Sequence, residues 1–391
     1  MSNPMEKNYT DLQKMLIHFT QSGGSDLFIT AGRPATMKQN SRLVNLTEDR
    51  IMPPLAIQLC KELMNEEQQA TFQETHECNF AYHIAGIARY RVNVFMQRGT
   101  PGMVIRAVQT EIPEFDSLKL PVILKELIME KNGLILIVGG TGSGKSTSLA
   151  SLVDHRNRES EGHIITIEDP IEFVHSHKRS IVTQREVGVD TDTYDSALKN
   201  TLRQAPNVIL IGEIRTKETM EHAIAFAETG HLCLSTLHSN NTNQTLDRII
   251  NFFPPDQHAH ILMDLSLNLR AIVSQRLVPK IGGGLIVAVE VLINTPRISE
   301  LILNGQVSEI KQLMQNSQAL GMQTFDHALF KLYEDELISF EDALRAADSA
   351  NDLRLSIKLK SKRPIPSETA SGVIAEETQF QLKTNATDST N

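Results

Sequence analysis

The stretch GGTGSGKST, residues 139–147, constrains the fold of this chain more than any other. Gly139, Gly144, Lys145 and Ser146 satisfy the spacing G-x-x-x-x-G-K-[ST] of a phosphate-binding loop. An apolar, β-branched run precedes the loop, and apolar residues at helical spacing follow it. This order of strand, glycine-rich loop and helix turns backbone N–H groups toward an anion. The motif therefore predicts that the chain binds a nucleoside triphosphate.

The side chains of the loop predict how the triphosphate is held. Lys145 is expected to reach the β- and γ-phosphates, and the Ser146 hydroxyl is expected to ligate Mg²⁺. ATP and Mg²⁺ are therefore the predicted ligand and cofactor. The other loop residues expected to contact the nucleotide are Gly139, Gly140, Thr141, Gly142, Ser143, Gly144 and Thr147.

Two further apolar runs end in carboxylates. ITIEDPIEF places Glu168, Asp169 and Glu172 after a predicted strand, and NVILIGEIR places Glu213 after another. Ligands bind outside the carboxyl ends of parallel strands, so these carboxylates are expected to face the phosphate loop rather than form solvated acidic turns. One carboxylate of the first group is expected to polarise the attacking water, and others to hold Mg²⁺ through its waters. Glu213 is predicted to coordinate Mg²⁺ through a water molecule.

Histidines and arginines supply further candidates. His231 and His238 stand at the two ends of the apolar strand LCLSTL, where a histidine can sense a γ-phosphate, bridge subunits or be purely structural. Arg89, Arg91 and Arg106 decorate a predicted hairpin near the N-terminus. They are either solvated surface arginines or arginine fingers that a neighbouring domain offers to the triphosphate.

The pattern along the 391 residues changes several times and predicts five segments. They are an α+β domain (1–110), a linker (111–132), an α/β core (133–298), a helical region (299–357) and a disordered tail (358–391). In the first segment we expect helices at 11–19 and 54–64, a short strand within 25–32 and a hairpin over 88–108 that turns around 99–102. In the core we expect a mostly parallel sheet covered on both faces, with strands at 134–138, 163–168, 207–213, 232–237 and 285–292.

Composition excludes several functional classes. No apolar run approaches the length of a membrane span, and the first residues do not have the pattern of a secretory signal, so a cytoplasmic protein is expected. Three scattered cysteines argue against a disulfide framework or a zinc site. The net charge of −9 argues against a nucleic-acid partner.

Taken together, the motifs resemble one protein family. GGTGSGKST, TIEDPIEFVH, VILIGEIR and AETGHLCLSTLH resemble, in order and spacing, the phosphate loop, Asp box, acidic strand and His box of secretion-superfamily ATPases. SDLFITAG, QREVGVDT, SQRLVPKIGGG and GMQTFDHAL are similar to segments of the type IV pilus retraction ATPases within it. The resemblance covers about residues 10–345. It implies a PAS-like α+β domain joined to a RecA-like P-loop ATPase domain with a small helical C-terminal region.

The resemblance also implies roles for residues at matching positions. Glu172 matches the family's catalytic glutamate, and Arg89 and Arg91 lie in a matching A-R-aromatic-R stretch expected to contact the nucleotide. Nucleotide would sit between the two domains of a homohexameric ring, peripheral at the cytoplasmic face of the inner membrane. Its implied partners are a companion retraction ATPase and an inner-membrane pilus platform protein. The expected catalytic residues are Glu168, Glu172, Glu213, His231, His238 and Arg106.

Departures from the family pattern favour its accessory, PilU-type branch over the principal, PilT-type motor. Gly140, Ala205, Asn207 and Thr216 replace a proline and three acidic residues. The segment RISELILN, 297–304, lacks both arginines of the principal motor's AIRNLIRE. We therefore expect an ATP-driven accessory motor for pilus retraction and twitching motility. The alternatives are the principal motor itself, a nucleotide-gated scaffold with little turnover and, less favoured, a pilus assembly ATPase or a nucleic-acid motor.

Overall fold

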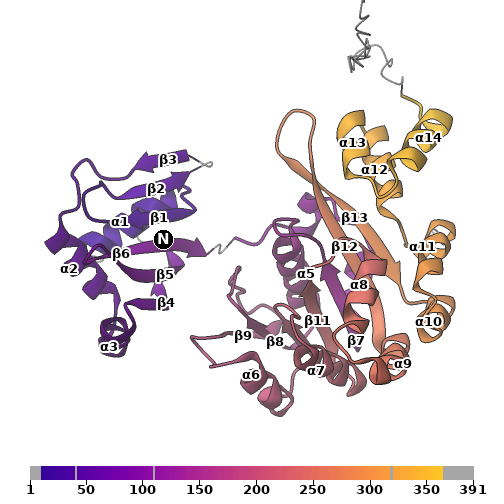
Figure 1. Ribbon diagram of the computed structural model, residues 1–391, viewed down its shortest axis with the longest axis horizontal. Coiled ribbons are helices and arrows are strands. Elements are labelled where there is room, and N and C mark those ends of the chain that lie inside the picture. Colours follow the sequence, from indigo (N-terminus) through magenta and orange to yellow (C-terminus); the bar gives the residue numbers. More distant parts are fainter. Residues whose placement is uncertain (1–9, 40–41, 109–110, 318–319, 364–391) are drawn as a thin grey trace, which may run out of the picture.

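The computed structural model describes residues 10–39, 42–108, 111–317 and 320–363, which form two sheets with their helices (Figure 1). The N-terminal sheet has six strands in the order β3-β2-β1-β6-β5-β4, and all its pairings are antiparallel. The elements of this part are α1 (Asp11–Gln21), β1 (Asp26–Ile29), β2 (Thr36–Gln39), β3 (Arg42–Asn45), α2 (Pro53–Leu63), α3 (Glu66–Thr75), β4 (Glu77–Ile84), β5 (Ala88–Gln97) and β6 (Thr100–Val108).

Alternation along β5 explains how this sheet packs. Its residues alternate between buried and half-buried over most of its length, because successive side chains of a strand point to opposite faces. One face carries Tyr90, Val92 and Val94, which join a core with the apolar residues of α1, α2 and α3. The other face carries Arg89 and Arg91, which are thereby directed away from that core.

The hairpin of β5 and β6 was predicted, but its turn was placed too late. The two strands are joined at Arg98 and Gly99, which have φ of 49° and 74°, and Thr100 already pairs with Gln97. Positive φ at both central residues is typical of a tight two-residue hairpin. The structure therefore places Pro101 inside β6 rather than in the turn.

The second sheet has seven strands in the order β13-β12-β7-β11-β10-β8-β9, and all neighbours are parallel except β12 and β13. The five predicted strands are confirmed as β7, β8, β10, β11 and β13, whereas β9 and β12 were not predicted. The elements are η2 (Phe115–Leu118), α4 (Ile123–Leu127), β7 (Gly133–Val138), α5 (Lys145–Glu159), β8 (Gly162–Glu168), β9 (Ser180–Glu186), α6 (Tyr194–Thr201), η3 (Leu202–Gln204), β10 (Val208–Ile211), α7 (Lys217–Glu228), β11 (Leu232–Leu237), α8 (Thr242–Ile250), η4 (Pro255–Gln257), α9 (His258–Asn268), β12 (Leu269–Pro279) and β13 (Leu285–Ile293).

Both faces of this sheet are covered, as predicted. Leu134, Leu136 and Val138 of β7 pack with the helices α6 to α11, while Ile135 and Ile137 pack with η2, α4 and α5. A strand buried on both faces reads as a continuous apolar run, which is why β7 was recognisable from sequence.

A group of helices follows the second sheet (Figure 1). They are α10 (Pro296–Leu303), α11 (Val307–Asn316), α12 (Phe325–Glu334), α13 (Phe340–Ala346) and α14 (Ala350–Lys360). Phe325, Leu329 and Tyr333 of α12 pack against Val278 and Ile286 of the strands β12 and β13. The predicted tail starts two residues before α14 ends, and its part from 364 onward lies outside the described residues. No helix within the described ranges is both long and apolar enough to cross a membrane.

Candidate functional site

The phosphate loop connects β7 to α5 and has the backbone that an anion site requires. At Gly139, φ is 155°, and a Cβ would lie 2.4 Å from Ser143 Oγ and 2.6 Å from Gln275 O, so only glycine fits. Gly144 precedes α5 with φ of 90°, and no side chain caps the helix. The first N–H groups of α5 are therefore left for an anion, which the helix dipole also favours.

Lys145 lies folded over this loop. Its Nζ donates to Gly139 O at 2.9 Å and to Gly140 O at 3.0 Å. Burial lowers the pKa of Lys145, although the nearby Glu213 carboxylate acts in the opposite direction. The hydroxyl of Ser143 is buried without a hydrogen-bond partner. A partly desolvated ammonium, an orphaned hydroxyl and an uncapped helix start fit a phosphate chain.

A cavity of about 1300 Å³ opens over the loop, between the two sheets. It brings together predicted residues from both domains, although they are distant in the sequence. The predicted residues that line it are Arg106, Thr141, Gly142, Ser143, Gly144, Lys145, Ser146, Thr147, Glu168, Glu172, Glu213 and His238. The carboxyl ends of β8, β10 and β11 face the loop as the parallel topology requires.

Glu168 ends β8 and is held by its neighbours. Burial raises the pKa of Glu168, while hydrogen bonds from Thr166 and Gln184 oppose that effect. The Thr166 hydroxyl donates at 2.6 Å and the Gln184 amide at 3.3 Å to the same oxygen, Oε1. This carboxyl is thus fixed in place.

Glu172 has a different environment. Its side chain is 50% exposed, and its Oε1 lies 3.4 Å from Nη2 of Arg91 in the other domain. The same Arg91 nitrogen donates to Ile171 O at 2.9 Å. Arg89 reaches the same side of the domain that carries the phosphate loop, with Nη2 3.3 Å from Glu186 Oε2.

The two predicted arginines lie beside the cavity rather than in its lining. Arg89 and Arg91 do not line the cavity; they bind carboxylates and a carbonyl of the domain that carries the phosphate loop, beside the cavity. Both Nε atoms are buried without a hydrogen-bond partner. In this conformation the two arginines connect the domains, because each side chain from the N-terminal sheet contacts residues of the domain that carries the phosphate loop.

Glu213 and His238 form a pair over the loop. Glu213 follows β10 and His238 follows β11, and these strands are neighbours in register. Glu213 Oε1 lies 3.3 Å from His238 Nε2, and its Oε2 lies 2.8 Å from Arg215 Nη2. Arg215 was not predicted, although it stands two residues beyond Glu213 in the same motif.

His231 is not brought into the cavity. It precedes β11 whereas His238 follows it, so the two histidines lie at opposite edges of the sheet. Its Nδ1 is 3.1 Å from Thr229 Oγ1 and 3.3 Å from Phe226 O. The structure thus places His231 outside this cavity, in contact with Thr229 and Phe226.

Arg106 of β6 lines the cavity from the N-terminal domain. Its Nε donates to Asp26 Oδ1 at 2.7 Å, across the pairing of β6 with β1, and its side chain is 59% exposed. His175 also lines the cavity and was not predicted as a site residue. Burial lowers the pKa of His175 to about 4. The signal available was its position at the end of the TIEDPIEFVH motif.

Comparisons with known proteins agree with this geometry. The family model described as type II/IV secretion system protein matches residues 10–284. The Pseudomonas aeruginosa type IV pilus ATPase PilU is 57% identical, over 90% of this chain and 92% of its own length. The Pseudomonas aeruginosa type IV pilus retraction ATPase PilT is 39% identical over 86% of this chain and 98% of its own. A crystal structure of the pilus retraction motor PilT with bound ADP superposes with a TM-score of 0.83 at 41% identity, covering 89% of this chain and all of that one.

Proposed function

Because the chain belongs to the type II/IV secretion system protein family, and within it to the type IV pilus retraction ATPases, we propose that it is an ATP-hydrolysing motor for pilus retraction and twitching motility. The observation that carries this proposal is the cavity itself. It joins Lys145, Glu172, Glu213 and His238 over one phosphate loop.

Each group has a chemical task in the proposed reaction. Lys145 would exchange its bonds to the loop carbonyls for bonds to the β- and γ-phosphates, and the Ser146 hydroxyl and Glu213 are the residues that would hold Mg²⁺. Mg²⁺ supplies charge neutralisation on the phosphate oxygens. Glu172 accepts the proton of the attacking water, and Glu168, already fixed by Thr166, orders the surrounding loop.

The proposed assembly is a homohexamer at the cytoplasmic face of the inner membrane. In a ring, a nucleotide between two domains experiences any movement of one domain against the other. Arg106, which lines the same cavity from the N-terminal domain, then serves as an arginine finger acting on charge in the transition state. The proposed partners are the inner-membrane pilus platform protein and a companion retraction ATPase.

We propose the accessory, PilU-type role rather than that of the principal motor. The 57% identity to PilU, against 39% to PilT, supports this choice. The segment RISELILN forms α10 from its second residue onward and the residue after it, and it carries Ser299 and Leu303 where the principal motor has arginines. Loss of exposed charge alters which surface a helix docks on more than it alters the fold.

The activity is tested by phosphate release from the purified chain with ATP and Mg²⁺, with Lys145→Ala as the matched control. We expect turnover by the wild type and none by the variant, because no other side chain supplies the cation. The variant should keep its fold, since Lys145 bonds only to loop carbonyls. Absence of turnover by a wild-type ring that binds ATP would leave the nucleotide-gated scaffold as the function.

A further inference from the structure

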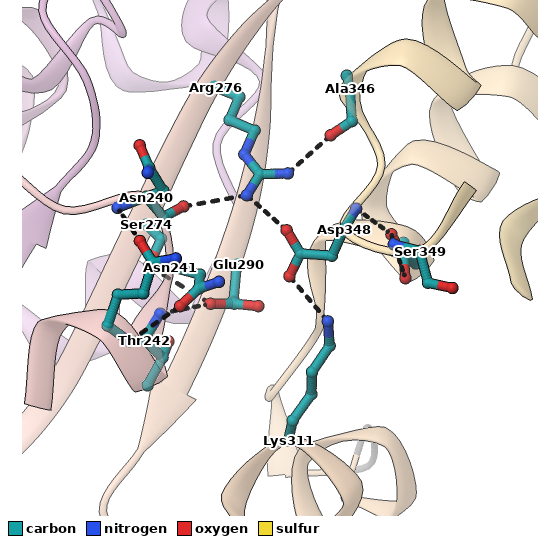
Figure 2. Close-up of polar contacts among 12 residues, drawn as sticks. Asn240, Asn241, Thr242, Ser274, Arg276, Glu290, Lys311, Ala346, Asp348 and Ser349 are labelled. Atoms are coloured by element: carbon teal, nitrogen blue, oxygen red, sulfur yellow. Dashed lines mark hydrogen bonds and ion pairs between the residues drawn. The ribbon is translucent and has the colours of Figure 1, made fainter. Parts of the chain in front are cut away.

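Side chains of two neighbouring strands, β12 and β13, form hydrogen bonds with the backbone of the loop that carries His238 and of the residue after it. The loop runs over residues 238–241, from the end of β11 to the start of α8. Arg276 of β12 donates from Nη2 to Asn240 O at 3.1 Å (Figure 2). Glu290 of β13, which is only 2% exposed, accepts the N–H of Thr242 at 2.8 Å. The backbone is therefore held at Asn240, within the loop, and at Thr242, the first residue of α8.

Arg276 is at the same time bound to the C-terminal helices. Its Nη2 lies 2.5 Å from Asp348 Oδ1, and its Nη1 donates to Ala346 O at 2.7 Å. Its guanidinium carbon lies 3.9 Å from the centre of the Phe325 ring. Figure 2 shows the single guanidinium between the loop on one side and the chain between α13 and α14 on the other.

Asp348 connects Arg276 to the C-terminal helices. Its carboxylate is 8% exposed, and its second oxygen lies 2.8 Å from Lys311 Nζ of α11. Burial raises the pKa of Asp348, but the hydrogen bonds and charges of Lys311 and Arg276 outweigh it, so the net pKa is lowered. The carboxylate is therefore charged at neutral pH. A buried charge of this kind keeps its partners close, because separating them is costly.

We propose that Arg276 is a positioning residue: it sets the place of His238 beside the nucleotide, and through Asp348 it makes that place depend on the C-terminal helices. The proposal rests on the proposed function, since it concerns the same nucleotide cavity. A shift of α13 and α14 moves Asp348 and Ala346, and Arg276 transmits the shift to Asn240, two residues from His238. Coupling of this kind is reciprocal, so nucleotide binding changes the mobility of the C-terminal helices as well.

The geometry of arginine is what makes the connection. The two terminal nitrogens of the planar Arg276 guanidinium donate to three acceptors, on Asn240, Ala346 and Asp348. A lysine keeps the charge but is a single point donor and cannot span them. Arg276→Lys is therefore the sharpest variant. Arg270→Lys is its matched control: Arg270 lies on the same strand, donates to Asn132 through two of its nitrogens and lies outside the cavity lining.

The first experiment measures kcat, KM and ATP affinity for the intact ring in a double-mutant cycle with His238→Gln. We expect Arg276→Lys to lower kcat about tenfold with little change in ATP affinity, and Arg270→Lys to leave both unchanged. In the His238→Gln background, Arg276→Lys should cost less than about twofold, because it acts through His238. An equal loss in both backgrounds, or an equal loss in Arg270→Lys, would overturn the proposal.

The second experiment does not depend on turnover. Hydrogen–deuterium exchange of the segments 238–245 and 340–350 is followed with and without ADP. In the wild type, ADP should change protection in both segments; in Arg276→Lys and in Asp348→Asn, only the first should respond. Asp342→Asn is the control and should behave as the wild type: it removes the ion pair with Arg345 on α13, while the amide oxygen still accepts the bond from the Ser339 hydroxyl. A response of 340–350 that survives in Arg276→Lys would overturn the proposal even if no ATP is hydrolysed. Absence of turnover with an intact exchange pattern would refute only the proposed activity.

Discussion

The guanidinium of Arg91 lies 3.4 Å from the carboxylate of Glu172, so the expected general base is ion-paired to the other domain. Arg91 also holds Ile171 O, and thereby fixes the backbone next to Glu172. We predict that Arg91→Ala lowers kcat about tenfold, because Glu172 loses its orientation. The matched control is Arg89→Ala: Arg89 binds Glu186 instead and does not touch Glu172. Steady-state kinetics on both variants test this orientation of Glu172. An equal fall in kcat in Arg91→Ala and Arg89→Ala would mean that the arginines act only by joining the domains.

Glu172 and Glu168 should behave differently when each is changed to glutamine. Glu172→Gln should retain ATP binding and lower turnover by about 10²–10⁴-fold, because an amide cannot accept the proton of water. Glu168→Gln should cost less, since the amide oxygen still accepts the bond from the Thr166 hydroxyl. Phosphate release and ATP binding are measured on each variant. A crippled Glu168→Gln beside a nearly normal Glu172→Gln would reverse the assignment.

Arg106 is expected to matter more for turnover than for folding. Its side chain is 59% exposed but its partner Asp26 is buried, so Arg106→Ala should lower stability by about 1–3 kcal/mol, because that carboxylate loses its cation. As an arginine finger it should cost about 10²-fold or more in kcat. Asp26→Asn is the control, because it removes the pair and leaves the arginine; its kcat should stay near the wild-type value. An unchanged kcat with a large fall in Tm would mark Arg106 as structural.

His175 predicts a pH dependence of stability. Its pKa is lowered by burial from an ordinary 6.5 to about 4, so the unfolded chain takes up the proton first as the pH falls. The neutral side chain contributes fully to the free energy of unfolding above about pH 6.5, and this contribution is lost progressively as the pH falls toward 4. The full loss is on the order of 3 kcal/mol. Denaturant unfolding of the wild type and His175→Gln at pH 7.5 and pH 5 should show a smaller acid effect in the variant; equal acid effects would contradict the assignment.

Much of the ATPase sheet could be predicted from sequence, because a strand buried on both faces is a continuous apolar run. The strand β9 was missed because Gln184, Arg185 and Glu186 make half of it polar. In β12, Ser274, Gln275 and Arg276 interrupt the apolar pattern, although the first two are fully buried. Ser274 Oγ bonds to Glu290 and Gln275 Nε2 bonds to Ser148, whereas Gln275 Oε1 has no partner; no local pattern reveals these distant contacts.

The cavity could be predicted to the extent that it follows from parallel strands. Glu168 ends a strand and Glu213 and His238 each follow one, so the topology alone brings them to one edge. The same reasoning places His231, which precedes its strand, at the other edge. The bond from Arg276 to Asp348 could not be foreseen, because it joins residues 72 apart in sequence through tertiary packing.

We expect this chain to hydrolyse ATP by itself yet to retract pili only beside a companion motor. The direct measurement is pilus retraction, scored by twitching, in a strain that lacks the companion and overproduces this chain. We predict no retraction there, and restored retraction when a catalytically dead companion is supplied together with this chain. The restoration should disappear when this chain carries Lys145→Ala. Robust retraction by this chain alone would contradict the accessory role and identify it as the principal motor.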